Sequence, residues 1–493
     1  MSSRKQRRDS RSSVQRQCAR LRDALDCNPN NISTLSKSIN WLLGDSDIFV
    51  NVAFHGNIKW NPAQLAFQAL VWSFQESRNV TDSFDRALAC CEKLAMSETA
   101  KTYPRFINAL ARYKCVASRV RDRIQECAEQ VGGRFWHKNS WVLFAFDGSR
   151  IGAPRTISNE KAFCARNYGQ GTTAQYRKKK SKGMRRKQNK RNKPEPPRPQ
   201  VWMTAVWHMG LRLTWTWRFG PSNSSERGHI EAILKEEEFP EKSLFCGDAG
   251  FVGYPLWSSI LAAKADFLVR VGANVSLLSE HADIRRVNDD IVLCWPKGKM
   301  HSGDPPLKLR LVRVKIGKTK MWILTSVLNR KNLSMKRIVR YYEMRWGIEV
   351  QYRGLKQTLE TCQLRCRNSD NALAELEWSV LGMMAVECLA LREQMLKNQL
   401  GRTNYQPSDR SLAKSIRAVR KCMNDPENVP APTKGLRHEL SIAVVQKYNN
   451  RTDKRSRYTP RNPDKKPLGD PKLEKLTAIH RRKLAEHIQK LAA

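Results

Sequence analysis

The chain has 493 residues, enough for about two to four domains with a large buried core. Lys and Arg number 89 against 46 Asp and Glu, and the resulting formal charge of +43 predicts an anionic polymer, most simply nucleic acid, as partner. No signal-peptide pattern or membrane-length apolar run occurs, and 13 cysteines without a regular framework favour reduced thiols in a cytosol.

The first part of the chain is predicted to be a basic, flexible N-terminus followed by helices. An Asn-Pro cap signal opens NPAQLAFQALVWSFQES, and apolar residues recur at helical spacing through residues 33–130. Ordinary core packing explains these positions as well as a DNA-recognition helix does. No single recognition helix is therefore assigned.

The next predicted elements are strands. The first is the apolar run Trp141 to Phe146, which is followed directly by Asp147 and Gly148. Asp-Gly is also a common turn dipeptide, so a hairpin turn is the alternative. A basic run, Arg177 to Lys193, then lies in a long insertion that we expect to be a phosphate-tracking arm, with a solvated loop as the alternative. Two strands, 201–208 and 211–219, follow around a tight turn.

A second carboxylate follows the next short strand. A helix is predicted over Glu226 to Glu238, then a strand from Ser243 to Phe245 that leads to Asp248. Asp248 is alternatively an N-cap for a helix over residues 254–263. With a strand over residues 266–271, the predicted order becomes β-β-β-α-β-α-β.

Further strands, IVLCW, LKLRLVRVKI and KMWILTSVL, are predicted between this core and the next helix. Gly317-Lys318-Thr319 resembles the end of a phosphate-binding loop, but Val312 replaces the first glycine that such a loop needs. A hairpin turn is the better interpretation.

One long helix, Ser334 to Glu360, is predicted to carry Tyr342, Arg345, Glu349 and Lys356. In a continuous α-helix these offsets place the four side chains within an arc of roughly 60°. Such a surface suits a phosphodiester beside a metal ion, although coincidental surface pairs are the alternative. A helix over residues 372–396 is expected to close the domain.

Glu349 needs partner acids to hold a catalytic metal, and Asp147 and Asp248 are the candidates. Magnesium prefers oxygen ligands and usually takes only about one to three carboxylates, which leaves sites for water and phosphate. Two such ions can stabilise the attacking and leaving oxygens of a phosphodiester.

The order of the three acids along the chain and the residues around them resemble the DDE transposases of bacterial insertion sequences. Within these, the chain resembles the cut-and-paste branch with a Tyr-Arg-Glu-Lys signature. The signature is matched without a gap or substitution by Tyr342, Arg345, Glu349 and Lys356. The two aspartate contexts are matched by FAFDGS and CGDAGFVGY, and the resemblance spans about residues 33–392.

This resemblance implies an α/β, ribonuclease-H-like catalytic domain with a mixed sheet. Asp147, Asp248 and Glu349 are then the catalytic metal ligands for Mg²⁺, with Mn²⁺ able to substitute. Tyr342, Arg345 and Lys356 are expected to bind DNA. The implied partners are the element's terminal inverted repeats, target DNA and a second copy of the chain, in the nucleoid of a prokaryotic cytoplasm.

The resemblance also implies endonuclease cutting at both element ends, through a DNA hairpin, followed by strand transfer. Trp322 and Trp346 are candidates for the base-flipping residue. The predicted domains are a basic N-terminus (1–32), a helical DNA-binding domain (33–135), the catalytic domain (136–272 with a basic loop 170–200, and 334–396), a β-rich insertion (273–333) and a basic C-terminal tail (397–493).

Three other functions remain open from the sequence. A transposase-derived DNA-binding protein would keep the fold without catalysis, and a nuclease of the same fold would cut without joining. A basic RNA-binding protein would share only the charge.

Overall fold

A computed structural model describes the residues 34–44, 46–56, 58, 60–76, 79–94, 96, 98–164, 198–271, 278, 281–300, 305–317, 319–424, 435–445 and 473–492. The chain divides into two compact units. Unit 1 comprises residues 1–133, 354–361 and 370–445, and unit 2 comprises residues 134–353, 362–369 and 446–493. The predicted arm, 177–193, and the basic N-terminus lie outside the described residues.

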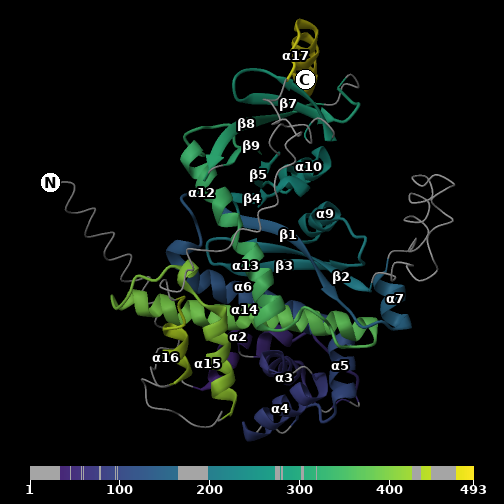
Figure 1. The fold of residues 1–493 in the computed structure, drawn as a ribbon, viewed down its shortest axis with the longest axis vertical. Coiled ribbons are helices and arrows are strands. Elements are labelled where there is room, and N and C mark those ends of the chain that lie inside the picture. The colour runs from purple at the N-terminus through teal and green to yellow at the C-terminus, as the bar shows by residue number, and fades with distance from the viewer. Residues whose placement is uncertain are drawn as a thin grey trace, which may run out of the picture. The chain divides into compact units, whose positions relative to one another are not determined.

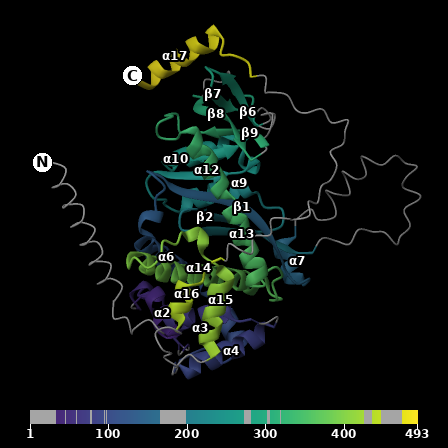
Figure 2. The same ribbon diagram turned by 60° about the vertical axis from the view of Figure 1, so that its left-hand side comes forward.

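Unit 1 is helical, which confirms the predicted helical character of the N-terminal region. Its N-terminal helices are α2 (Leu35–Leu43), α3 (Pro62–Phe74), α4 (Val80–Lys93), α5 (Tyr103–Arg112) and α6 (Lys114–Gly132). Asn61 caps α3 in a reciprocal capping box with Gln64, as the Asn-Pro signal predicts. Most of α14 (Ser369–Gln399), α15 (Leu412–Asn424) and α16 (Leu436–Ser441) complete this unit. Helices α15 and α16 lie side by side in both views (Figures 1 and 2).

Unit 2 is an α/β unit around one mixed sheet, which confirms the predicted fold class. Among the described residues, nine strands form the order β3-β2-β1-β4-β5-β9-β8-β7-β6. The core strands are β1 (Val142–Gly152), β2 (Gln200–His208), β3 (Leu213–Gly220), β4 (Ser243–Gly247) and β5 (Asp266–Arg270). Strands β1, β4 and β5 run parallel, and the residues 142–146, 243–247 and 267–269 of these strands are buried, as expected for a sheet covered on both faces.

The predicted β-rich segment extends the same sheet. It contains β6 (Ala282–Arg286), β7 (Ile291–Pro296), β8 (Leu307–Ile316) and β9 (Thr319–Thr325). Strand β9 pairs antiparallel with β5, so the insertion continues the core sheet. β6 was missed by the sequence analysis because ADIRR shows no run of apolar residues. Lys318 lies outside the described residues, but β8 and β9 pair up to Ile316 and Thr319, which agrees with a hairpin.

The helices near the sheet in unit 2 are α7 (Ile157–Phe163), α9 (Glu226–Glu236), α10 (Tyr254–Ala262), α12 (Met335–Arg345) and α13 (Gly347–Arg353). Helix α9 contacts β1, β2 and β3, α12 contacts β4 and β8, and α13 contacts β1 (Figure 1). Helix α17 (Ala478–Ala492) lies in the predicted tail. Within the described residues, every helix falls short of the length and apolar character needed to cross a bilayer.

The prediction of one uninterrupted helix over residues 334–360 is wrong. Helix α12 ends at Arg345, α13 runs from Gly347 to Arg353, and a π-helical turn follows over Gly354–Thr358. Gly347 has tertiary contacts at the break: a Cβ atom there would collide with the Trp207 ring of β2. Close approach of the helix to the sheet is therefore possible only because residue 347 has no side chain.

Candidate active site

Asp147 and Asp248 occupy equivalent positions on neighbouring parallel strands. The parallel register of β1 and β4 pairs Ala145 with Cys246, and each aspartate lies two residues beyond this pair. Carboxyl ends of adjacent parallel strands form the crevice in which open α/β sheets bind ligands. Both carboxylates thus reach the same edge of the sheet.

The prediction that a strand stops at Asp147 is incorrect in detail. Strand β1 continues to Gly152 and pairs Asp147 with Ala205 of β2, so the alternative of a hairpin turn is also wrong. The Asp147 Oδ1 atom accepts a 2.9 Å hydrogen bond from the Gly148 N–H. Burial is the main cause that raises the pKa of Asp147 to about 6, and the nearby Asp248 and Glu349 carboxylates also raise it. The hydrogen bond from Gly148 and the charge of Arg345 lower this pKa and offset part of the effect.

Asp248 leaves the sheet directly after β4. Its Oδ1 atom accepts a 2.8 Å hydrogen bond from the Gly250 N–H and caps a short 3₁₀ turn, Ala249–Phe251. The N-cap of the following helix α10 is Gly253. The alternative prediction, that Asp248 is the N-cap of that helix, is therefore wrong. The local bond fixes the carboxylate beside the end of β4 and leaves its second oxygen for other contacts.

Glu349 lies in the first turn of α13, and two contacts position this helix on the sheet. Tyr352, one turn further on, donates its hydroxyl proton toward the carbonyls of Asp147 (2.9 Å) and Met203 (3.2 Å). Gly347 packs against Trp207, as described above. These contacts anchor Glu349 to the strand that carries Asp147, and one third of its side chain stays exposed.

Arg345 forms an ion pair with Glu349. Its Nη2 atom lies 3.4 Å from Glu349 Oε1, and its guanidinium lies 5.4 Å from the centroid of the Tyr342 ring. Arg345 is buried, with 7% of its surface exposed, and its Nε atom has no hydrogen-bond partner. Tyr342 is buried to a similar degree. The guanidinium is thus held beside the acids with donor capacity to spare.

Lys356 lies on a different helical segment from the other signature residues. It is on the π-helical turn 354–358, which belongs to unit 1, whereas Tyr342, Arg345 and Glu349 belong to unit 2. The 60° arc predicted for all four residues requires a continuous α-helix, which the chain does not form. Contacts join Tyr342 to Arg345 and Arg345 to Glu349.

Glu226 is a fourth acid at this edge, and the sequence analysis missed it. It is the first residue of α9, where the N-cap Ser225 accepts a hydrogen bond from the Gly228 N–H. A Cβ atom on Gly148 would collide with the Glu226 carboxylate, so this side chain lies over the residue that follows Asp147. Burial raises the pKa of Glu226 to about 7, and the Asp147 and Asp248 carboxylates add to the effect, against Arg150 and Arg227.

These acids suit a divalent cation by donor type, since Mg²⁺ and Mn²⁺ bind carboxylate oxygens. Among the residues that the structure describes, no three acidic, His or Cys side chains converge closely enough to form a complete cluster as they are placed. Magnesium needs no such cage, because water and substrate phosphate supply most of its ligands. Asp147 and Asp248, from adjacent strands, are the residues that fit this role best.

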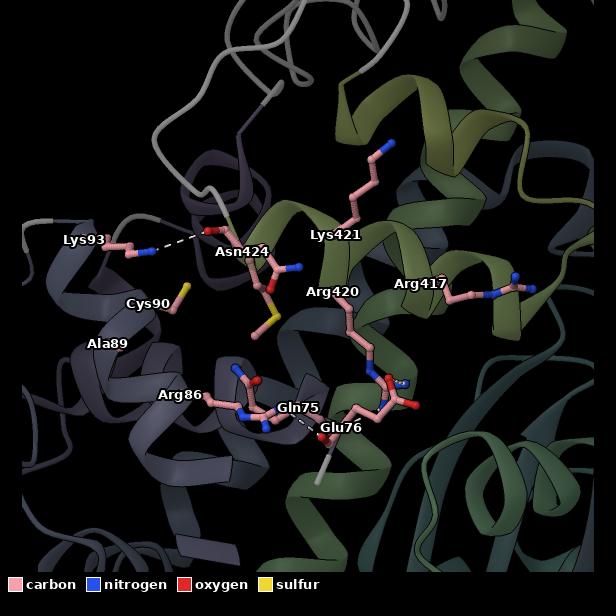
Figure 3. Close-up of a pocket in the computed structure, with 11 residues that line it drawn as sticks. Gln75, Glu76, Arg86, Ala89, Cys90, Lys93, Arg417, Arg420, Lys421 and Asn424 are labelled. Atoms are coloured by element: carbon pink, nitrogen blue, oxygen red, sulfur yellow. Dashed lines mark hydrogen bonds and ion pairs between the residues drawn. The ribbon is translucent and has the colours of Figure 1, made fainter. Parts of the chain in front are cut away.

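Unit 1 contains a separate pocket of about 600 Å³ between α3, α4 and α15 (Figure 3). Five of its lining residues are cations: Arg86, Lys93, Arg417, Arg420 and Lys421. Two of them cap helix ends: Arg420 Nε donates to the Phe74 carbonyl at the end of α3 (2.7 Å), and Lys93 Nζ donates to the Asn424 carbonyl at the end of α15 (3.4 Å). Cations at helix C-termini stabilise the unpaired carbonyls there, so the pocket is explained without a ligand.

Comparison with known proteins relates much of unit 2 and part of unit 1 to one domain family. Residues 142–384 match the family model of the transposase DDE domain. A cryo-EM structure of a piggyBac transposase synaptic complex with hairpin DNA aligns with a TM-score of 0.39 and 13% identity, over 85% of this chain and 87% of that one, a likeness too distant to inform on function. Comparison with curated proteins found no match. The stretch that carries Asp147, Asp248 and Glu349 is therefore similar in sequence to the transposase DDE domain family.

Proposed function

We propose that this protein is a metal-dependent DNA transposase that cuts at the ends of its own element and joins them to target DNA. The observation that carries the proposal is the placement of Asp147 and Asp248, each two residues beyond the last parallel pair of β1 and β4, with the Glu349 helix anchored to the strand of Asp147. The family match over residues 142–384 and the charge of +43 support it.

In this proposal Asp147, Asp248 and Glu349 hold the divalent cations. When bound, such cations supply Lewis acidity that stabilises the attacking and leaving oxygens of a phosphodiester. The carboxylates come from a sheet edge and an anchored helix, so their separation is set by the fold before substrate arrives. Tyr352 and Gly347 are positioning residues because they act on the helix and not on the reacting atoms.

Arg345 is proposed to bind the phosphate next to the scissile bond. A guanidinium held rigidly presents several donors at once and suits a phosphate better than a flexible ammonium does. Its 3.4 Å pairing with Glu349 keeps it at the site before DNA binds. Tyr342 lies beneath the guanidinium and restricts its movement, and Lys356 is proposed to contact the backbone further along.

Trp346 is proposed to stack on a flipped base during hairpin formation. Its side chain is 56% exposed although it directly follows the buried Arg345. Trp322 is the poorer candidate, since its indole Nε1 is buried without a partner and its ring lies near Arg313. Insertion at a second site would need both element ends together, so we propose a dimer in the DNA complex.

The test is strand cleavage and joining by purified protein with Mg²⁺ and a plasmid that carries the DNA flanking this gene. Wild type is compared with Glu349→Gln and with the control Glu343→Gln, an exposed acid on α12. Metal-dependent cutting that disappears only in Glu349→Gln supports the site, and joined products support transposition. Cutting without joining would indicate a nuclease, and DNA binding with equal, negligible cutting would indicate a binding protein.

A further inference from the structure

We propose that Glu226 is an additional acid of the metal site, which binds the cation or its coordinated water together with Asp147 and Asp248. The inference rests on the proposed function, since it adds a residue to the same site. It depends on the position of the side chain in the fold, because nothing in the local sequence around Glu226 marks it as functional.

The Glu226 carboxylate lies next to two glycines, Gly148 and Gly250, and each glycine is close in sequence to one of the two aspartates. It occupies the space over Gly148, the neighbour of Asp147, where any Cβ atom would collide with it. On the other side, an ideal Cβ atom on Gly250 would lie 3.6 Å from Glu226 Oε2 and 3.0 Å from Asp248 Oδ1. The carboxylates of Glu226 and Asp248 thus both lie near the Cβ position of Gly250, and Asp147 directly precedes Gly148.

The backbone brings Glu226 to this place. Strand β3 ends at Gly220, and the chain turns through Ser225 into α9, which contacts β1, β2 and the 3₁₀ turn after Asp248. As the first helical residue, Glu226 points from the start of α9 back toward the sheet edge. The three acids therefore come from the middle of β1, the residue after β4 and the N-terminus of α9.

The simpler alternative is that Glu226 only complements the α9 dipole and neutralises Arg150 and Arg227. An acid in a first helical turn is stabilised by the dipole wherever its side chain points. That role does not require a position against two other carboxylates, where like charges repel. A divalent cation shared between them removes this repulsion, which favours the metal-site interpretation.

The test measures metal binding directly. Mn²⁺ is titrated into the full-length protein without DNA, and free Mn²⁺ is followed by electron paramagnetic resonance. We expect Glu226→Gln to weaken Mn²⁺ affinity by about tenfold or more, as loss of residues supporting a metal site does. Glu226→Asp, which keeps the charge, should recover part of the affinity. Glu231→Gln on the same helix is the control and should match wild type.

Two results separate failure of this inference from failure of the proposed function. If Asp147→Asn weakens Mn²⁺ binding and Glu226→Gln does not, the inference is overturned and the site stands. If neither Asp147→Asn nor Glu349→Gln changes Mn²⁺ binding or cleavage, the proposed metal site is wrong and the inference fails with it. Circular dichroism of each variant establishes that the fold is kept.

Discussion

The Tyr352 hydroxyl lies 2.9 Å from the main-chain carbonyl of Asp147 and links the helix of one candidate metal ligand to the strand of another. Tyr352 is almost fully buried, so this bond is not exchanged for one with water. The spacing between Glu349 and Asp147 therefore depends on a residue that would never touch the DNA.

Replacing Tyr352 with Phe is expected to lower the cleavage rate by more than the loss of folding stability accounts for. The change leaves a buried carbonyl without its donor and should cost about 1–3 kcal/mol of unfolding free energy. Tyr341→Phe is the matched control, because Tyr341 donates a similar bond to the Lys138 carbonyl (3.0 Å) from the neighbouring helix. Denaturation and kcat are measured for both. Equal losses of kcat in the two variants would contradict a positioning role for Tyr352.

Replacing Gly347 with Ala should displace α13 from the sheet. The added methyl would meet the Trp207 ring, and overpacking of this kind costs about 1–3 kcal/mol. Gly228→Ala on α9 is the control, since its nearest neighbour is at an ordinary 3.7 Å and an Ala favours the helix. Thermal unfolding and cleavage assays check both. A Gly347→Ala protein with unchanged stability and cleavage would argue against close packing at this break.

The metal-free protein should lose stability as pH rises from about 4 to 7. Folding raises the pKa of Asp147 to about 6 and of Glu226 to about 7, so the folded state binds more protons than the unfolded state in this window. Stability falls with pH wherever the folded state binds more protons. Urea denaturation in EDTA across this range measures the slope.

Asp147→Asn and Glu226→Gln should each flatten that pH dependence, because each removes one group whose pKa is raised. Each variant should also be more stable than wild type at pH 8 without metal, where both acids are charged and repel. The same slope in wild type and both variants would show that other groups carry the pH dependence.

Replacing Trp346 with Ala should impair hairpin formation without harming the fold. Its exposed indole contributes little to the core, whereas stacking on a base is worth about 1–3 kcal/mol. Trp346→Phe keeps an aromatic surface and should retain most activity. Fluorescence of 2-aminopurine at the terminal nucleotides reports base flipping directly. A normal fluorescence change in Trp346→Ala would exclude this residue and leave Trp322 to be tested in the same way.

Local sequence patterns predicted most elements of unit 2. Strand and helix periods recovered β8 at its observed bounds and located β4, α9 and α10 within a few residues. These elements have apolar periodicity and capping residues that act over a few positions in the chain. The helix break at Trp346 escaped prediction because Gly347 is required by a ring on β2, far away in the sequence.

The sequence by itself determined that Asp147 and Asp248 come after apolar runs, and that Glu349 lies in a helix with Arg345 one turn before it. Only the tertiary structure decided that β1 and β4 are neighbours in register, that Lys356 belongs to the other unit, and that Glu226 joins the acids. The physical reason is that helix and strand periods are set by neighbouring residues. Convergence of side chains depends on which distant strands pair, and no local pattern encodes that choice.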